Sequence, residues 1–95
     1  MTYQLTNDAT HDMIELYVYS LSEYGDARAD HYQQVLESHF LTLVDNPLLG
    51  RDFSHIRQGV RRSLCQSHGI YYRATDAGIL ILRVLHQSSD PARFV

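Results

Sequence analysis

The 95-residue sequence has no lysine, one cysteine and two prolines, and its longest apolar run is short. A single cysteine, Cys65, cannot form an intramolecular disulfide, so nothing indicates an oxidising compartment. The apolar run around Ile79 to Leu82 is far shorter than the ~20 residues that span a bilayer. Residues Met1 to Leu5 lack the basic start and apolar segment of a secretion signal. We therefore expect a soluble, cytoplasmic protein.

Length and composition limit the organisation of the chain. With 44% apolar residues over 95 positions, there is enough material for one hydrophobic core of modest stability. A second domain would not fit. We therefore expect one domain over residues 1–95.

Charge is unevenly divided along the chain. Residues 1–45 contain one arginine against eight acidic residues, a net charge of −7, whereas residues 46–95 contain seven arginines against three, a net charge of +4. Arginine is the only strongly basic residue used, and its planar guanidinium suits paired hydrogen bonds to carboxylates or phosphates. A GC-rich genome would produce the same bias.

Apolar residues recur at spacings of three and four in two segments, which is typical of one buried helix face. We expect a first helix from about Asn7 to Ser22 with Thr6 as its N-cap, because a hydroxyl there accepts from a free amide. A second helix follows from the cap Asp26 to Asn46, and Pro47 ends it. The short link makes an antiparallel hairpin. The face positions are Ala9, Met13, Leu16, Tyr17, Ser20 and Tyr24, then Ala29, Tyr32, Leu36, Phe40 and Leu43.

After residue 59 the apolar spacing changes to two, which indicates strands. We expect strands at Val60–Gln66, His68–Thr75 and Ile79–His86, in addition to an extended start at Tyr3–Leu5. The fold class is therefore α+β in the order β-α-α-β-β-β. The helical hairpin packs on one face of a largely antiparallel four-stranded sheet.

The last strand is apolar on both faces, which predicts a central position. Ile79, Ile81 and Leu85 alternate with a second set of apolar residues, Leu80, Leu82 and Val84. Because the helices cover only one face, we expect a partner chain to cover the other.

Four spaced segments between Asn46 and Asp90 are more specific than the composition. They are Asn46–Arg51, Ile56–Arg62, His68–Arg73 and Ile81–His86. Preceded by two helices, this succession resembles the ParE branch of the RelE/ParE toxin superfamily. The resemblance implies the fold above, and the toxin of a bacterial type II toxin–antitoxin pair that acts by protein binding without catalysis. The implied target is DNA gyrase, whose DNA-cleavage complex such toxins trap; the target-contacting residues are unknown.

The same resemblance implies a ParD-like antitoxin as partner. Its DNA-binding half would form a ribbon-helix-helix dimer on operator DNA, which the toxin would reach only through the antitoxin. Its disordered tail would wrap the toxin, with apolar anchors on the hairpin and carboxylates on arginines that converge on one surface. About half of the arginines are expected to pair internally instead. The expected contacts are Leu16, Tyr17, Tyr24, Leu36, Phe40, Arg61, Arg62, Arg73 and Arg83.

Two other functions remain open. A RelE-like ribosome-dependent mRNA endonuclease would need a base, an acid and positive charge, which His68, His86, Tyr71, Arg62 and Arg83 could supply. Against this, Gly69 stands where a basic residue is expected in RNA-cutting relatives, and the chain is net acidic. The third function is a degenerate, non-toxic module that only binds antitoxin.

No cofactor or metal site is expected. His11 and Glu15 have ligand spacing on a helix, but no recognised metal motif accompanies the six histidines. We expect surface histidines, with His86 hydrogen-bonded at a strand end. Cys65 is expected to be a small sheet residue, because no acid is near to orient His68 beside it.

Overall fold

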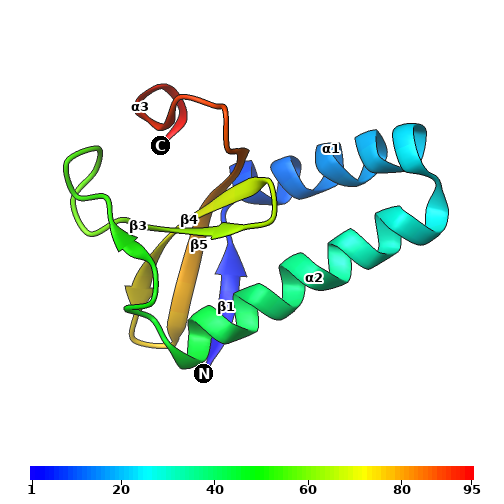
Figure 1. The fold of residues 1–95 in the computed structure, drawn as a ribbon. Helices are drawn as coiled ribbons and strands as arrows, with labels where there is room; N and C mark the ends of the chain where they lie inside the picture. The colour runs from blue at the N-terminus through cyan, green and yellow to red at the C-terminus, as the bar shows by residue number, and fades with distance from the viewer.

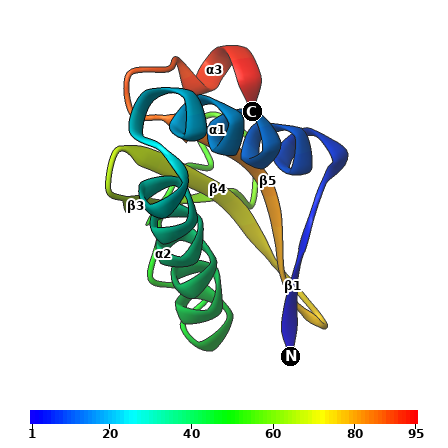
Figure 2. The same cartoon turned by 90° about the vertical axis from the view of Figure 1, so that its right-hand side faces the viewer.

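The computed structural model describes all residues, 1–95, and forms two layers. One sheet has the strand order β1-β5-β4-β3-β2, in which β1 is parallel to β5 and the other pairs are antiparallel. The two long helices form a hairpin (Figure 1) and lie on the same side of the sheet (Figure 2). The elements are β1 (Thr2–Leu5), α1 (Asn7–Tyr24), α2 (Asp26–Asp45), β2 (Arg51–Asp52), β3 (Arg61–Cys65), β4 (His68–Thr75), β5 (Gly78–His86) and α3 (Pro91–Phe94).

The α+β fold and the hairpin are confirmed, and β5 lies inside the sheet as predicted. The count of four strands is wrong, because β2 adds a fifth. Its two residues are too few to produce a periodic pattern, and pairing with β3 defines it. The short α3 was also not predicted, although Asp90 caps it by accepting the N–H of Ala92 at 3.0 Å.

Caps set the helix ends. The Thr6 hydroxyl accepts the N–H of Ala9 at 3.1 Å, as predicted. Helix α1 continues to Tyr24, and Gly25 rather than Asp26 joins the two helices, with a φ of +85° that glycine adopts without strain. None of the helices has the length and apolar character needed to cross a membrane.

The main core lies between the hairpin and the sheet. Leu36 and Phe40 of α2 pack with Ile70, Tyr72 and Ile81 of the sheet, and each side chain is at most 1% exposed. Burial of this kind is the main source of stability in small domains. The apolar face predicted for the second helix therefore packs into the core, as the spacing of its residues indicates.

Tyr72 fixes the exit from α2. Its buried hydroxyl donates to the carbonyl of Pro47 and accepts the N–H of Gly50, both at 2.8 Å. A Cβ atom at position 50 would lie 2.5 Å from the Tyr72 oxygen, so only glycine fits. The loop after α2 is thereby held against the sheet.

The chain itself covers much of the second sheet face. Phe53, Val60, Tyr71, Leu82 and Leu85 form a cluster whose members are 1–8% exposed. Ile56, Leu80 and Val95 pack against the cluster. The prediction that a partner must cover this face is therefore wrong for these residues, because the β2–β3 loop and the C-terminus cover them.

A β-bulge explains which residues of β5 reach that face. Tyr71 pairs with Arg83 while Tyr72 pairs with Ile81, so Leu82 is an extra residue on β5. Beyond it the alternation reverses, and Val84 joins the main core while Leu85 joins the second cluster. The sequence-based assignment of these two residues is wrong for this reason.

Candidate functional site

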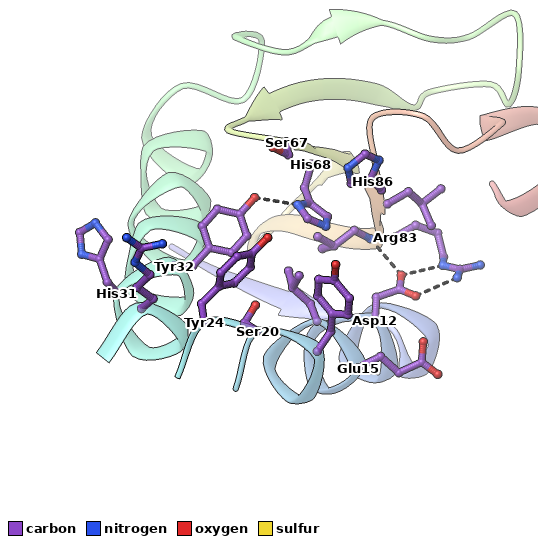
Figure 3. A pocket seen from close by; sticks show the side chains of 15 residues that line it. Asp12, Glu15, Ser20, Tyr24, His31, Tyr32, Ser67, His68, Arg83 and His86 are labelled. Carbon is purple, nitrogen blue, oxygen red and sulfur yellow. Dashed lines mark hydrogen bonds and ion pairs between the residues drawn. The ribbon is translucent and has the colours of Figure 1, made fainter. Parts of the chain in front are cut away.

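A cleft of about 770 Å³ lies between the helical hairpin and the ends of β4 and β5 (Figure 3). Helices α1 and α2 contribute aromatic and charged side chains, and the strand ends contribute two histidines. The lining residues include Leu16, Tyr19, Tyr24, Arg28, Tyr32, His68, Arg83 and His86.

His68 is a half-buried titratable group of this cleft. Its Nδ1 lies 2.6 Å from the hydroxyl of Tyr32, and its ring meets that of His86 edge-on at 5.4 Å across the β4–β5 pair. Burial, and then the charge of His86, lower the pKa of His68. Burial also raises the pKa of Tyr32. The hydrogen-bonded pair is therefore neutral at neutral pH.

The remaining histidines follow the prediction only in part. His86 is exposed, with Nδ1 2.7 Å from the Ser88 hydroxyl, which confirms a hydrogen-bonded strand-end residue. His39 and His68 are half-buried, so the prediction of surface histidines is wrong for both. His39 Nε2 lies 2.7 Å from the Ser63 hydroxyl, and burial lowers its pKa. Both residues connect α2 to the sheet.

Arg83 forms a bidentate ion pair with Asp12. Its Nε and Nη2 donate to the two carboxylate oxygens of Asp12 at 2.8 Å each, and its Nη1 donates to the carbonyl of Phe94 at 3.2 Å. The hydrogen bonds that Arg83 donates to Asp12 raise the pKa of Arg83. The pairing of some arginines with the acidic helices is thus confirmed. As an antitoxin contact Arg83 is not supported, because its guanidinium is already engaged.

The predicted arginines do not all converge on one surface: Arg62 and Arg73 lie on the face away from the helices, whereas Arg61 lies on the helix side. Arg61 pairs with Tyr72 on the helix side and donates to the carbonyl of Gly50 at 2.9 Å. Arg62 pairs with Tyr71, and its guanidinium lies 4.6 Å from the Phe53 ring on the opposite face. Arg73 is exposed. Because neighbouring residues of a strand point to opposite faces of the sheet, Arg61 and Arg62 are separated.

The predicted helical contacts differ in accessibility. Leu16 and Tyr24 line the cleft, and Tyr24 is 56% exposed. Tyr17 lines a second groove, and its hydroxyl donates to Asp30 at 2.5 Å, which raises the pKa of Tyr17. Leu36 is fully buried, so a direct contact there is not supported. Phe40 is 1% exposed and reaches only the floor of the second groove.

The second groove, of about 530 Å³, lies between α1, α2 and β1 and is mostly apolar. Ile14 and Val18 of α1 line it and are 57% and 58% exposed. Sequence reasoning missed both, although they are apolar residues four apart that lie off the core stripe. Unpartnered apolar side chains of this kind mark interaction surfaces.

The residues that RNA cleavage would need are divided between the two faces. His68 and His86 lie at the cleft, whereas Arg62 and the buried Tyr71 lie on the other face. Arg83 is bound by Asp12. No group of three or more histidine, cysteine, aspartate or glutamate side chains is placed to hold a metal ion.

Comparison with solved structures shows the fold. A chain described as "Chromosomal ParDE TA system from P. aeruginosa" superposes with a TM-score of 0.77. It is 23% identical, and the match covers 90% of this chain and 95% of that one. The two chains therefore share one architecture.

Comparison of sequences shows the family. The family described as "ParE toxin of type II toxin-antitoxin system, parDE" matches residues 3–91. Toxin ParE1 of Caulobacter vibrioides is 31% identical over 88 residues, covering 93% of this chain and 91% of the relative. Toxin ParE1 of Mycobacterium tuberculosis is 32% identical over 92 residues, covering 96% and 94%. The chain belongs to the ParE toxin family of type II toxin–antitoxin systems.

Proposed function

We propose that this toxin inhibits DNA gyrase by trapping its DNA-cleavage complex, through protein binding and without a reaction of its own. The family supports this target. The observation that favours binding over catalysis is the division of His68, His86, Arg62 and Tyr71 between two faces. General acid–base catalysis requires its groups within hydrogen-bond reach of one substrate.

The test uses purified toxin with gyrase, relaxed and supercoiled plasmid and ATP. The expected result is inhibited supercoiling together with linear DNA that forms only when gyrase is present. The toxin is also expressed alone in bacteria, where growth arrest is expected. Arrest without any gyrase effect would contradict the proposal and direct attention to ribosome-dependent RNA cleavage. No arrest would favour a degenerate module that only binds antitoxin.

We further propose that a ParD-like antitoxin neutralises the toxin by seating apolar residues on both sides of α1. On one side the cleft offers Leu16 and Tyr24, and on the other the groove offers Ile14, Tyr17 and Val18. An amphipathic or extended partner segment gains affinity by filling such grooves. The antitoxin would carry the operator-binding domain, so the toxin reaches operator DNA only through it. We propose that the complex is cytoplasmic.

Titration calorimetry of toxin variants with the antitoxin tests the apolar contacts. Val18→Ser is expected to weaken binding about tenfold or more, since truncating a well-seated apolar side chain costs more than about 1 kcal/mol. Leu41→Ser is the matched control, because Leu41 is 56% exposed and lines neither groove. Equal losses for the two variants would contradict the proposed position of the antitoxin.

The charged part of the proposal rests on Arg61, Arg62 and Arg73. Alanine at both Arg61 and Arg62 is expected to weaken antitoxin binding, with a further loss for Arg73→Ala. Because exposed charges are screened by salt, the loss should shrink at high ionic strength. Unchanged affinity for the double variant would remove the electrostatic contribution.

A further inference from the structure

Two arginines face each other on neighbouring strands, on the sheet face that the two long helices do not cover. We call this the outer face. Arg51 of β2 and Arg62 of β3 are direct register partners, so their side chains share one side of the sheet. Like charges directly opposite each other destabilise a strand pair. The next pair along, Asp52 with Arg61, is of opposite sign and points to the other side. The repulsive pair is thus confined to the outer face.

A third arginine shares this face. Arg73 lies two residues beyond Tyr71 on β4, and Tyr71 is the register partner of Arg62, so all three point to the same side. Arg51 and Arg73 are exposed and Arg62 is half-exposed. We call Arg51, Arg62 and Arg73 the outer arginine face.

None of these guanidinium groups has a carboxylate partner. The ion pairs of the structure are Arg83 with Asp12 and His11 with Glu15, both elsewhere. The hydrogen bonds that arginine side chains donate come from Arg61 and Arg83. The donors of the outer arginine face are therefore free for a ligand.

Arg62 is held in position for an external ligand. Its guanidinium stacks on the Phe53 ring at 4.6 Å. A Cβ atom at position 69 would lie 3.3 Å from Arg62 Cδ and 3.3 Å from Tyr71 Cε1, so the absence of a side chain at Gly69 leaves room for the arginine stem. A guanidinium fixed in this way loses little conformational entropy when it binds an anion.

The acidic residues lie mainly on the other side of the sheet. Residues 1–45, with a net charge of −7, form β1 and the two long helices, and those helices cover the inner face. The sheet thus separates an acidic layer from the outer arginine face. A large polyanion would approach the molecule from the arginine side.

We propose that the outer arginine face binds the phosphate backbone of duplex DNA, an activity beyond the proposed inhibition of gyrase. A phosphate placed between Arg51 and Arg62 would remove their repulsion and accept paired hydrogen bonds. Arg73 would meet a second phosphate. No cavity includes these three residues, so a peptide finds no pocket for an apolar anchor, whereas regularly spaced backbone charge matches a flat surface.

Fluorescence anisotropy of a labelled duplex of about 20 base pairs, titrated from about 25 to about 200 mM salt, measures the interaction. With three arginines engaged, the logarithm of the binding constant should fall against the logarithm of salt with a slope of about −3. Arg51→Gln and Arg73→Gln should each make the slope shallower by about 1. Arg28→Gln is the control, since Arg28 is equally exposed but lies on α2, and its slope should not change.

A glutamate-rich peptide in the same assay distinguishes phosphate from carboxylate recognition. Binding of the peptide without binding of DNA would overturn the proposal, as would absence of DNA binding at the lowest salt. Slopes unaffected by Arg51→Gln and Arg73→Gln would overturn it too. Neither position is buried, and thermal melting confirms that both variants fold. The assay contains no gyrase and no antitoxin, so its failure and a failure of the proposed function are distinguishable.

Discussion

The carboxylate of Asp12 holds Arg83 by two hydrogen bonds of 2.8 Å and also accepts the N–H of Val84 at 3.0 Å. One side chain of α1 thus binds both the side chain and the backbone of β5. With side-chain exposures of 9% for Asp12 and 20% for Arg83, loss of either partner leaves a poorly solvated charge.

We expect Asp12→Ala to lower the free energy of unfolding by about 3 kcal/mol, the cost of breaking a largely buried pair. Urea denaturation measures the change. Glu15→Ala is the control: its side chain is 68% exposed and pairs only with His11, so the loss should be about 0.5 kcal/mol or less. Similar losses for the two variants would show that the Asp12 contact contributes no more than a surface pair.

Stability should fall as the pH drops below about 6.5. Burial lowers the pKa of His39 and His68, so the unfolded chain binds protons more readily than the folded one. The stabilisation is fully present above the unfolded pKa and is lost as the pH falls through the lowered folded values. Urea midpoints measured between about pH 7.5 and pH 5 test this.

The variant that tests this is His68→Gln, which should flatten the pH dependence of stability because it removes a histidine whose pKa is lowered by burial. If the stability of His68→Gln still falls with pH as steeply as that of the wild type, groups other than His68 cause the pH dependence.

Removal of the Tyr72 hydroxyl should destabilise the fold. Tyr72→Phe leaves the Gly50 N–H and the Pro47 carbonyl without the partner that satisfies both. We expect a loss of about 1–3 kcal/mol in thermal or urea unfolding. Tyr19→Phe, at a side chain that is 56% exposed, should change stability by no more than about 0.5 kcal/mol.

Leu36 should affect stability rather than recognition. Leu36→Ala creates a cavity in the main core and should cost about 2–5 kcal/mol. At a temperature where the variant stays folded, its antitoxin affinity should match the wild type. A specific loss of affinity in folded protein would restore Leu36 as a direct contact. Leu41→Ala, at an exposed position, is the stability control.

Sequence periodicity predicted the layers well because burial imposes it. Ala29, Leu36, Phe40 and Leu43 recur on one side of α2, and all are at most 1% exposed. The two apolar faces of the last strand likewise predicted its position inside the sheet. These patterns depend only on local spacing, which the sequence displays directly.

Features that depend on pairing or irregular backbone were not predictable. The bulge at Leu82 reverses the alternation of side chains between the two faces of β5, and it places Leu85 in the second cluster. The cover over that face comes from a loop and a terminus that have no periodic pattern. The separation of Arg61 from Arg62 required their strand register. The buried and exposed sides of the helices were therefore predicted better than those of the strands.

The side-chain contacts of α1 have a consequence for how this sheet can grow. Strand β1 pairs with β5 only as far as Ile81. Beyond that point the Thr6 hydroxyl donates to the Leu82 carbonyl at 2.8 Å and Asp12 accepts the Val84 N–H. These contacts occupy backbone groups in the half of β5 that β1 does not pair with, so a further strand cannot pair there. Proteins commonly protect the edges of sheets in this way. Any partner that extends the sheet by a strand must therefore add it beside β1 or at the edge formed by β2 and the rest of β3, which are the two opposite edges of the sheet.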